Sequence, residues 1–504
     1  IRLAHIPARP AQLLHAMREH LHAVDPALER DPCPLSHDLY ALCLLIYYLY
    51  DKTPPPQQLA ACFPKTHDIA PVKRALTDKI RVEVLGFDDH YLFVENTADN
   101  APLRVIMPSR DEESPIRPLG DYLCAGATLN LIRPREVEQE GGVALEPELI
   151  VYEPDYLINI SSIAACFRPE GISPFTYLLG KLRPTRLSNA IELGNLAGEL
   201  LDLHVHHKTF RVAEAMTQFA RRRALIATAP HIDYASLADE AERQSTYIRQ
   251  TLDETLPRVS SVYRREELLL EPSFYGQILG LEGRMDLLQR DLRLLIEQKA
   301  GKGAFYHTGD VAPQKQEPHY VQILLYQALL YYALRHRGET ETYLLYSKYP
   351  HPLLSVGGAP RLLKTAIALR NELVAYEQHY RRYGFDVLRS LTPERFNTRH
   401  KEGKLWECYT EPELWRFLAP CHHASPLAWC YFVRLSRSVV EEQALAKVGS
   451  GASQHYGAAG RWLLSLAERE ATGTLLTHLA VHLDPEERGH YRRLTFTPLS
   501  PSGA

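Results

Sequence analysis

The feature of this sequence that most limits its possible folds is a pair of apolar runs that carry charges. Residues 283–301 are GRMDLLQRDLRLLIEQKAG, in which two apolar runs flank a short polar centre. Runs of this length on either side of a polar break predict two adjacent antiparallel strands joined by a tight turn near Asp291. Such a turn places Asp286 roughly opposite Glu297, so the two acids fall at one level of the hairpin.

The charges of this hairpin are expected to converge on one patch. Side chains two residues apart in a strand share a face, so Glu297 and Lys299 point the same way and Gln298 points to the other face. Two carboxylates one strand spacing apart repel each other unless a cation lies between them, and carboxylate oxygens suit Mg²⁺ or Mn²⁺. The predicted metal ligands are Asp286, Glu297 and the main-chain carbonyl of Gln298. Lys299 is expected to orient a water or stabilise negative charge. The alternative is a solvated strand face with cross-strand ion pairing.

The next segment has the apolar spacing of a helix and carries its own polar pair. Residues 319–337 are HYVQILLYQALLYYALRHR, in which Gln322 and Tyr326 are four residues apart and share a helix face. A polar pair on an apolar helix is a candidate for contacting substrate or positioning the lysine, and its alternative is a structural role. His319, at the start of this helix, and Arg284, in the hairpin, are further candidates for substrate contact.

The order of these residues resembles the active site of the RecB-like branch of the PD-(D/E)XK nucleases. That resemblance implies an α/β fold with a restriction-endonuclease-like core, in which helices flank a mixed central sheet. It implies two metal-binding acids, a catalytic lysine and a helix that contacts substrate. The matching positions are Gly283, Arg284, Asp286, Glu297, Lys299, Gln322 and Tyr326.

Looser similarity surrounds this core and points to the nuclease domain of the eukaryotic nuclease-helicases that process flaps in replication and repair, with this chain as a bacterial relative. In those domains a small barrel-like region precedes a PD-x-L-(I/V)-S-x-T passage, and an Arg-Asn helix follows the core. The helix implies a substrate-contacting role for Arg370. The corresponding positions are Pro154, Asp155, Leu157, Ser161 or Ser162, Cys166 and Arg168, then Arg370 and Asn371.

Two positions depart from the family pattern. Gly198 stands where the family has a metal-binding histidine, and Glu199 or Asp202 is a candidate substitute. The nearby His204, His206 and His207 match no standard metal spacing and are expected to be solvated.

Many relatives also hold a [4Fe-4S] cluster with one early and three late cysteines. The late spacing here differs from that pattern, so buried structural thiols are favoured over a cluster, and another metal aided by His422 or His423 is a further alternative. The four cysteines are Cys166, Cys408, Cys421 and Cys430.

Changes of pattern along the 504 residues divide the chain into four segments. Residues 1–77 and 441–504 have helical spacing, 78–160 has short alternating runs that predict an antiparallel sheet or small barrel, and 161–440 is the predicted nuclease domain. No uncharged apolar run approaches the roughly 18 residues of a membrane span, and no signal peptide is recognisable. A cytoplasmic protein without a membrane partner is expected, associated with the nucleoid if the protein is bacterial.

The predicted function is metal-dependent hydrolysis of DNA, with single strands, flaps or ends as the substrates that the resemblance implies. The net charge of −4 argues against a uniformly basic surface, but a local groove can still be positive, and the run Arg221 to Arg223 is either such a contact or a solvated helix face. No GxxxxGK[ST] motif is present, so the expected helicase partner is another domain or subunit. Two alternatives remain open: a catalytically silent single-strand-binding scaffold and a defence nuclease with the same chemistry.

Overall fold

The computed structural model describes residues 78–110, 114–139, 142–184, 187–206, 209–230, 232–307, 309–450, 456–483 and 494–498. The predicted helical segment 1–77 and His207 lie outside them. The described residues form two compact units. The smaller unit contains residues 78–106 and the described part of 131–148, and the larger unit contains the rest. The four segments expected from the sequence stay a prediction.

The smaller unit is a sheet of short strands whose buried and exposed residues alternate. In its first strand, Val82 and Val84 are buried while Glu83 and Leu85 are exposed, as a sheet with one covered face requires. The strand order is β5-β6-β3-β2-β1. Neighbours pair antiparallel as expected, except that β3 and β6 are parallel. The strands are β1 (Lys79–Phe87), β2 (Tyr91–Asn96), β3 (Pro102–Ile106), β5 (Arg135–Gln139) and β6 (Gly142–Glu146); β4 (Thr128–Ile132) crosses the boundary between the units.

The centre of the larger unit is a five-stranded mixed sheet, which confirms the predicted mixed α/β class. Its order is β11-β14-β15-β16-β17, and only the β15–β16 pair is parallel. The connection from β15 to β16 contains helix α11, as a crossover between parallel strands needs. The elements are β11 (Leu268–Leu270), β14 (Leu287–Gln289), β15 (Leu294–Lys299), β16 (Glu341–Tyr346), β17 (Leu353–Ser355), α11 (Glu317–Ala328) and the π-helical turn η5 (Leu329–Ala333).

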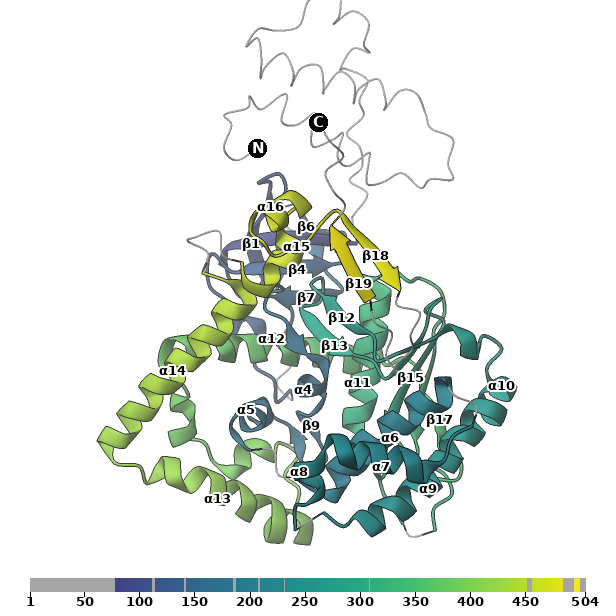
Figure 1. The fold of residues 1–504 in the computed structure, drawn as a ribbon. Helices are drawn as coiled ribbons and strands as arrows, with labels where there is room; N and C mark the ends of the chain where they lie inside the picture. Colours follow the sequence, from purple (N-terminus) through teal and green to yellow (C-terminus); the bar gives the residue numbers. More distant parts are fainter. Residues whose placement is uncertain are drawn as a thin grey trace, which may run out of the picture. The chain divides into compact units, whose positions relative to one another are not determined.

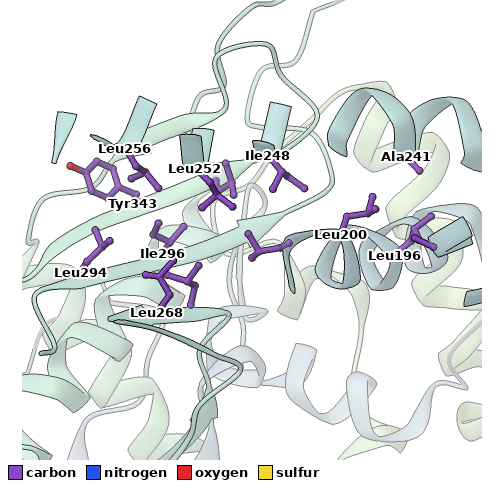
Figure 2. Close-up of a cluster of buried hydrophobic side chains, with 14 of the residues drawn as sticks. Leu196, Leu200, Ala241, Ile248, Leu252, Leu256, Leu268, Leu294, Ile296 and Tyr343 are labelled. Carbon is purple, nitrogen blue, oxygen red and sulfur yellow. The ribbon is translucent and has the colours of Figure 1, made fainter. Parts of the chain in front are cut away.

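Helices α6 and α9 cover one face of this sheet (Figure 1). Figure 2 shows the apolar cluster between them, in which Leu196 and Leu200 of α6 lie in the same core as Leu294 and Ile296 of β15. Burial of each such side chain stabilises the fold by roughly 1.5–3 kcal/mol. The helical layer comprises α6 (Asn189–His206), α7 (Val212–Arg222), α8 (Ala224–Ala227), α9 (Tyr234–Gln250), η3 (Thr251–Thr255) and α10 (Leu256–Val259).

Helix α11 covers the opposite face and packs against the short helix α4 and the long helix α12. A three-stranded sheet, β12-β13-β8, also lies in this unit and leads directly into the hairpin through β13. The remaining elements near it are β7 (Leu149–Tyr152), β8 (Ile158–Asn159), α4 (Ile160–Ala164), β9 (Phe167–Arg168), β10 (Gly171–Ile172), β12 (Ser273–Gly276), β13 (Leu281–Arg284), and the 3₁₀ turns η2 (Leu119–Asp121) and η4 (Arg265–Glu267).

A second apolar cluster joins α5, α12, α13 and α14, with Phe175, Tyr380, Leu418 and Val440 among its buried members. The expected helical segment after residue 440 also contains a β-hairpin, β18 with β19, which the sequence reasoning missed. No described helix has both the length and the apolar character needed to cross a membrane. The elements are α5 (Phe175–Leu182), α12 (Pro360–Tyr383), η6 (Asp386–Arg389), η7 (Pro393–Phe396), η8 (Trp406–Thr410), α13 (Glu411–His422), α14 (Pro426–Val448), η9 (Gly457–Ala459), α15 (Gly460–Leu463), α16 (Leu466–Ala471), β18 (Leu479–Leu483) and β19 (Leu494–Pro498).

Candidate active site

The predicted hairpin is present, and its register brings the two acids together. Strands β14 and β15 pair antiparallel, with Leu287 opposite Ile296. One step further along this register Asp286 faces Glu297, and Asp286 Oδ2 accepts a hydrogen bond of 2.7 Å from the main-chain N–H of Gln298. The turn is closed by Leu292, which adopts a left-handed conformation (φ 64°).

The alternation of β15 separates its polar side chains between the two faces of the sheet. Glu297 and Lys299 lie on the α11 face, where Lys299 Nζ is 2.8 Å from Glu297 Oε1. Gln298 points the opposite way, and its Nε2 donates to the carbonyl oxygen of Ala197 in α6 at 3.1 Å. Glu297 is almost closed off from water, being only 2% exposed, while the Lys299 side chain is partly exposed.

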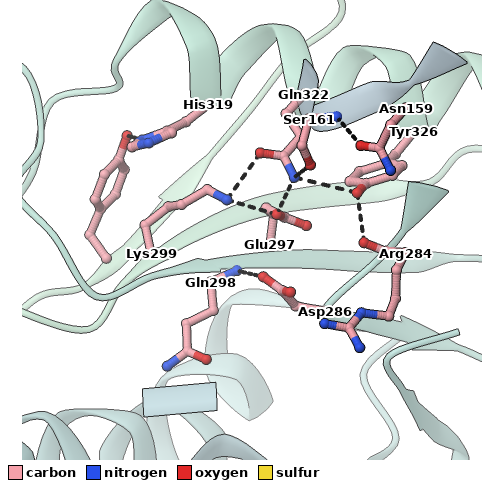
Figure 3. Close-up of polar contacts among 11 residues, drawn as sticks. Asn159, Ser161, Arg284, Asp286, Glu297, Gln298, Lys299, His319, Gln322 and Tyr326 are labelled. Carbon is pink, nitrogen blue, oxygen red and sulfur yellow. Dashed lines mark hydrogen bonds and ion pairs between the residues drawn. The ribbon is translucent and has the colours of Figure 1, made fainter. Parts of the chain in front are cut away.

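Helix α11 supplies an amide that links the acid and the lysine (Figure 3). Gln322 Oε1 accepts from Lys299 Nζ at 3.0 Å, and Gln322 Nε2 donates to Glu297 Oε1 at 2.6 Å. Tyr326, one turn further along the helix, receives a 3.3 Å hydrogen bond from Gln322 Nε2 and donates to the carbonyl oxygen of Arg284 at 2.6 Å. These contacts fix which end of the amide faces the lysine.

Two short elements complete the support of this network. The hydroxyl of Ser161 in α4 lies 3.3 Å from Gln322 Nε2, so Ser161, and not Ser162, meets the site. Gly283 in β13 lies beneath the ring of Tyr326, and a Cβ at this glycine would be only 2.8 Å from Tyr326 Cε1. The glycine of the sequence motif is thus needed for the close approach of the tyrosine ring.

The acids of the site are buried, and burial disfavours their charged forms. Burial raises the pKa of Asp286 above its usual range, although Lys299 opposes that shift. Burial and the neighbouring charge of Asp286 raise the pKa of Glu297. Burial alone would lower the pKa of Lys299, but the charges of Glu297 and Asp286 outweigh it and raise that pKa. Glu297 Oε2 is buried without any hydrogen-bond partner, which is costly for a carboxylate oxygen.

Helix α6 adds two further acids, with different surroundings. Glu199 forms an ion pair with Arg222 of α7. Burial, together with the charges of Glu271, Glu199 and Asp286, raises the pKa of Asp202 to about 7. A Cβ built at Gly198, where the family histidine would stand, meets nothing within 4 Å. Across the described ranges, no group of three or more His, Cys, Asp or Glu side chains is placed to hold a metal ion.

Other predicted residues lie elsewhere or have different partners. Arg284 pairs at the surface with Glu271, at 3.0 Å. His319 Nδ1 is 2.9 Å from the hydroxyl of Tyr346, and burial lowers the pKa of His319 to about 3. Tyr346 is the partner of Lys299 in the β15–β16 register, a neighbour that sequence reasoning missed because it requires knowing which strands pair.

Arg370 is fully buried, and its guanidinium binds main-chain carbonyl oxygens. Its guanidinium donates to the carbonyl oxygens of Gly280, Tyr152, Glu153 and Tyr156, and none of these belongs to the site.

The candidate cysteine ligands do not meet. Cys166 is buried and its thiol is 3.4 Å from the carbonyl oxygen of Ser162, while Cys408 and Cys430 are exposed and Cys421 is half-buried. His204, expected to be solvated, is buried, and its Nε2 is 2.8 Å from the hydroxyl of Ser245.

Comparison with known proteins adds little. No family model matches the chain, and no curated protein matches it. Among solved structures, a crystallised candidate exonuclease from Eubacterium rectale aligns over 44% of this chain and 81% of its own, with 13% sequence identity and a TM-score of 0.30. That similarity is too low to support an argument, so the function is inferred from the site.

Proposed function

We propose that this chain is a divalent-metal-dependent deoxyribonuclease that acts on single-stranded DNA, flaps or ends in repair or replication, working beside a helicase. The observation that carries the proposal is the joint network of Asp286, Glu297, Lys299 and Gln322 (Figure 3). A purely structural network would be expected to satisfy its buried charges, whereas here a carboxylate oxygen is left unpaired. The order of these residues along the chain matches the family pattern, and α6, β14, β15, α11 and β16 would form its PD-(D/E)XK core.

The donor set fits Mg²⁺ or Mn²⁺. Asp286 and Glu297 supply hard oxygen ligands from adjacent strands, and the unpaired Glu297 Oε2 is available to a cation. The main-chain carbonyl of Gln298 would be the third protein ligand. A bound divalent ion would supply Lewis-acid polarisation of the scissile phosphate and activation of a water.

The chain's own side chains have separable tasks. An ammonium group has three N–H donors, and Lys299 gives two of them to Glu297 and Gln322, which leaves one for a phosphate oxygen or the attacking water. Gln322 fixes the direction of that remaining donor. Tyr326 holds Gln322 by accepting from its amide, so it is a positioning residue and need not touch DNA.

The test is cleavage of end-labelled single-stranded and duplex DNA with Mg²⁺ or Mn²⁺. Asp286→Asn and Lys299→Met should each lower the cleavage rate at least about a hundredfold while retaining DNA binding. Asp291→Asn is the matched control, because Asp291 lies in the turn of the same hairpin and only accepts hydrogen bonds there. Native-like cleavage by Asp286→Asn would overturn the proposal.

One observation favours a second candidate, a scaffold that binds single strands without cutting them: the family histidine is replaced by Gly198. In that case the native chain would bind DNA and never cleave it with any divalent ion. Gly198→His distinguishes the two, because the position is open and its neighbour Ala197 contacts β15 through Gln298. For a nuclease the variant should lower the Mn²⁺ concentration needed for half-maximal cleavage, and Gly194→His, at an equally open site, should not. A defence role for the same chemistry would change the biological substrate and not these results.

A further inference from the structure

The loop that connects β15 to α11 presents an unpaired aromatic side chain to solvent. Phe305 is 79% exposed, while its neighbour Tyr306 packs beside Tyr349 with ring centroids 6.1 Å apart. Single exposed apolar residues are common on protein surfaces, so exposure alone would carry nothing. The backbone of Phe305 is also in an unfavourable conformation. It is left-handed (φ 50°), which residues with a Cβ seldom adopt.

Hydrogen bonds join the two sides of the loop, residues 302–304 and 314–316, just before Phe305. The main-chain N–H of Ala304 donates to the carbonyl oxygen of Gln314 at 2.8 Å. Gly303 donates to the hydroxyl of Tyr349 at 2.8 Å, and Gln316 Nε2 donates to the carbonyl oxygen of Lys302 at 2.7 Å. Both sides of the loop are thereby tied together, and Phe305 is the first residue beyond the ties.

Glycine is required at the crossing of the two sides. A Cβ at Gly303 would lie 2.5 Å from the carbonyl oxygen of Gln314, so only glycine lets the two sides approach this closely. The aromatic ring is therefore displayed on a rigid stem, which lowers the entropy cost of using it to bind a partner.

Residues 300–316 carry two lysines, Lys302 and Lys315, and one acid, Asp310, whose Oδ2 accepts from the main-chain N–H of His307 at 2.7 Å. Lys302 Nζ lies 4.4 Å from the ring centroid of Tyr306, and Lys315 Nζ lies 3.6 Å from that of Tyr320. Both lysines are exposed, and neither is paired with a carboxylate among the residues that the structure describes. They are held over aromatic rings instead, which leaves their charge available to an anion.

The loop is also continuous with the candidate active site at both ends. It follows Lys299 directly, and it ends at the helix that carries Gln322. At its second end the main-chain N–H of Gln316 donates to the hydroxyl of Tyr346, the strand partner of Lys299. Both ends of the loop therefore adjoin residues of the candidate active site.

We propose that Phe305 stacks on an unpaired base beside the scissile phosphate, with Lys302 and Lys315 binding the phosphates on either side. A flat aromatic ring flanked by cations suits a nucleic acid strand whose bases are unstacked, and a base inside a duplex presents no face to it. This inference rests on the proposed nuclease function and narrows its substrate to a single-stranded segment.

The test is fluorescence anisotropy with a labelled oligo(dT) and a blunt duplex in EDTA, so that binding is measured without cleavage. Phe305→Ala should weaken oligo(dT) binding about tenfold, Phe305→Trp should retain it, and duplex binding should not change. Tyr409→Ala is the control, because Tyr409 is another exposed aromatic residue and lies in η8, outside this loop. The oligo(dT) with an abasic position at the contacted nucleotide should bind native and Phe305→Ala chains equally.

The outcomes separate the two proposals. If the native chain cleaves single strands and Phe305→Ala binds oligo(dT) like Tyr409→Ala, the stacking inference is wrong and the nuclease proposal stands. If the native chain binds no DNA of either kind, both proposals are wrong. Equal loss of oligo(dT) and duplex binding in Phe305→Ala also overturns the inference, because stacking on an unpaired base cannot weaken duplex binding.

Discussion

Gly283→Ala should damage the site more than the fold. The added Cβ would lie 2.8 Å from Tyr326 Cε1 and 3.2 Å from Ile160 Cδ1, whereas ordinary contacts begin at 3.4 Å. The tyrosine ring must therefore move by about 0.6 Å, on a surface where Ile160 leaves it little room. Overpacking of this size costs about 1–3 kcal/mol of unfolding free energy.

The same movement breaks the support of the Gln322 amide. Tyr326 OH donates to the carbonyl oxygen of Arg284, next to Gly283 in β13, and accepts from Gln322 Nε2 at 3.3 Å, so displacing the ring by about 0.6 Å from that strand should disrupt the contacts that hold Gln322. Because Gln322 directs Lys299, we expect cleavage to fall by about ten- to a hundredfold. The assays are urea unfolding and the cleavage rate of end-labelled single-stranded DNA.

Gly276→Ala is the matched control, since its added Cβ would be 3.4 Å from Leu329, an ordinary contact, in the strand β12 that pairs with β13. It should cost under about 0.5 kcal/mol. On a Tyr326→Ala background the stability cost of Gly283→Ala should largely disappear, because the ring that it strikes is gone. Equal costs for Gly283→Ala and Gly276→Ala, or a cost that persists on that background, would refute the close-packing argument.

Two further variants test buried groups outside the hairpin. Arg370→Met leaves four main-chain carbonyl oxygens without their donor, so it should lower the free energy of unfolding by more than about 4 kcal/mol in urea titrations. A loss below about 1 kcal/mol with weakened DNA binding would instead support the substrate-contacting role that the resemblance implies. Burial lowers the pKa of His204 to about 4 from about 6.5, so protonation favours the unfolded chain, and stability that is complete above pH 6.5 is lost as the pH falls towards 4. Between pH 7.5 and pH 5 this amounts to about 2 kcal/mol, and His204→Gln, which still bonds Ser245 but cannot titrate, should lack that part of the pH dependence.

The hairpin could be predicted because its information is local. Two apolar runs with a polar turn between them fix the register, and the register places Asp286 against Glu297. The period of two in a strand then separates Glu297 and Lys299 from Gln298, as their partners in α11 and α6 show. The helical spacing likewise placed Gln322 beside Tyr326.

The contacts that were missed depend on the arrangement of distant segments. Tyr346 adjoins Lys299 only because β16 pairs parallel with β15. Asp202 is expected near the site only as a substitute for the family histidine, and its approach to Asp286 depends on the packing of α6 on the sheet. The family resemblance implies a substrate-contacting role for Arg370, but the fold surrounds its guanidinium with carbonyl oxygens. The parallel pairing of β3 with β6 was equally invisible in their alternating patterns.

Neutralising the two aspartates of the hairpin should change the stability of the fold in opposite directions. Burial raises the pKa of Asp286, so the stability it contributes is present only at low pH and is lost as the pH rises through its folded pKa. Burial also opposes ionisation of Asp291, but the hydrogen bonds from Gln289 and Arg293 outweigh it and lower that pKa, so Asp291 stabilises the fold above its unfolded pKa.

At pH 7, Asp286→Asn should therefore raise the urea midpoint, by a free energy on the order of 1 kcal/mol, while it abolishes cleavage. Asp291→Asn should lower the midpoint and leave cleavage unchanged. Both are measured in EDTA, because a bound cation would stabilise the native chain and not the Asn variant. A gain in stability on neutralising Asp286 means that the chain keeps a charge there against its own folding energy, which is expected of a site selected for binding or chemistry. If both variants lose stability equally, burial does not dominate at Asp286, and cross-strand ion pairing that stabilises the hairpin is the better account of these charges.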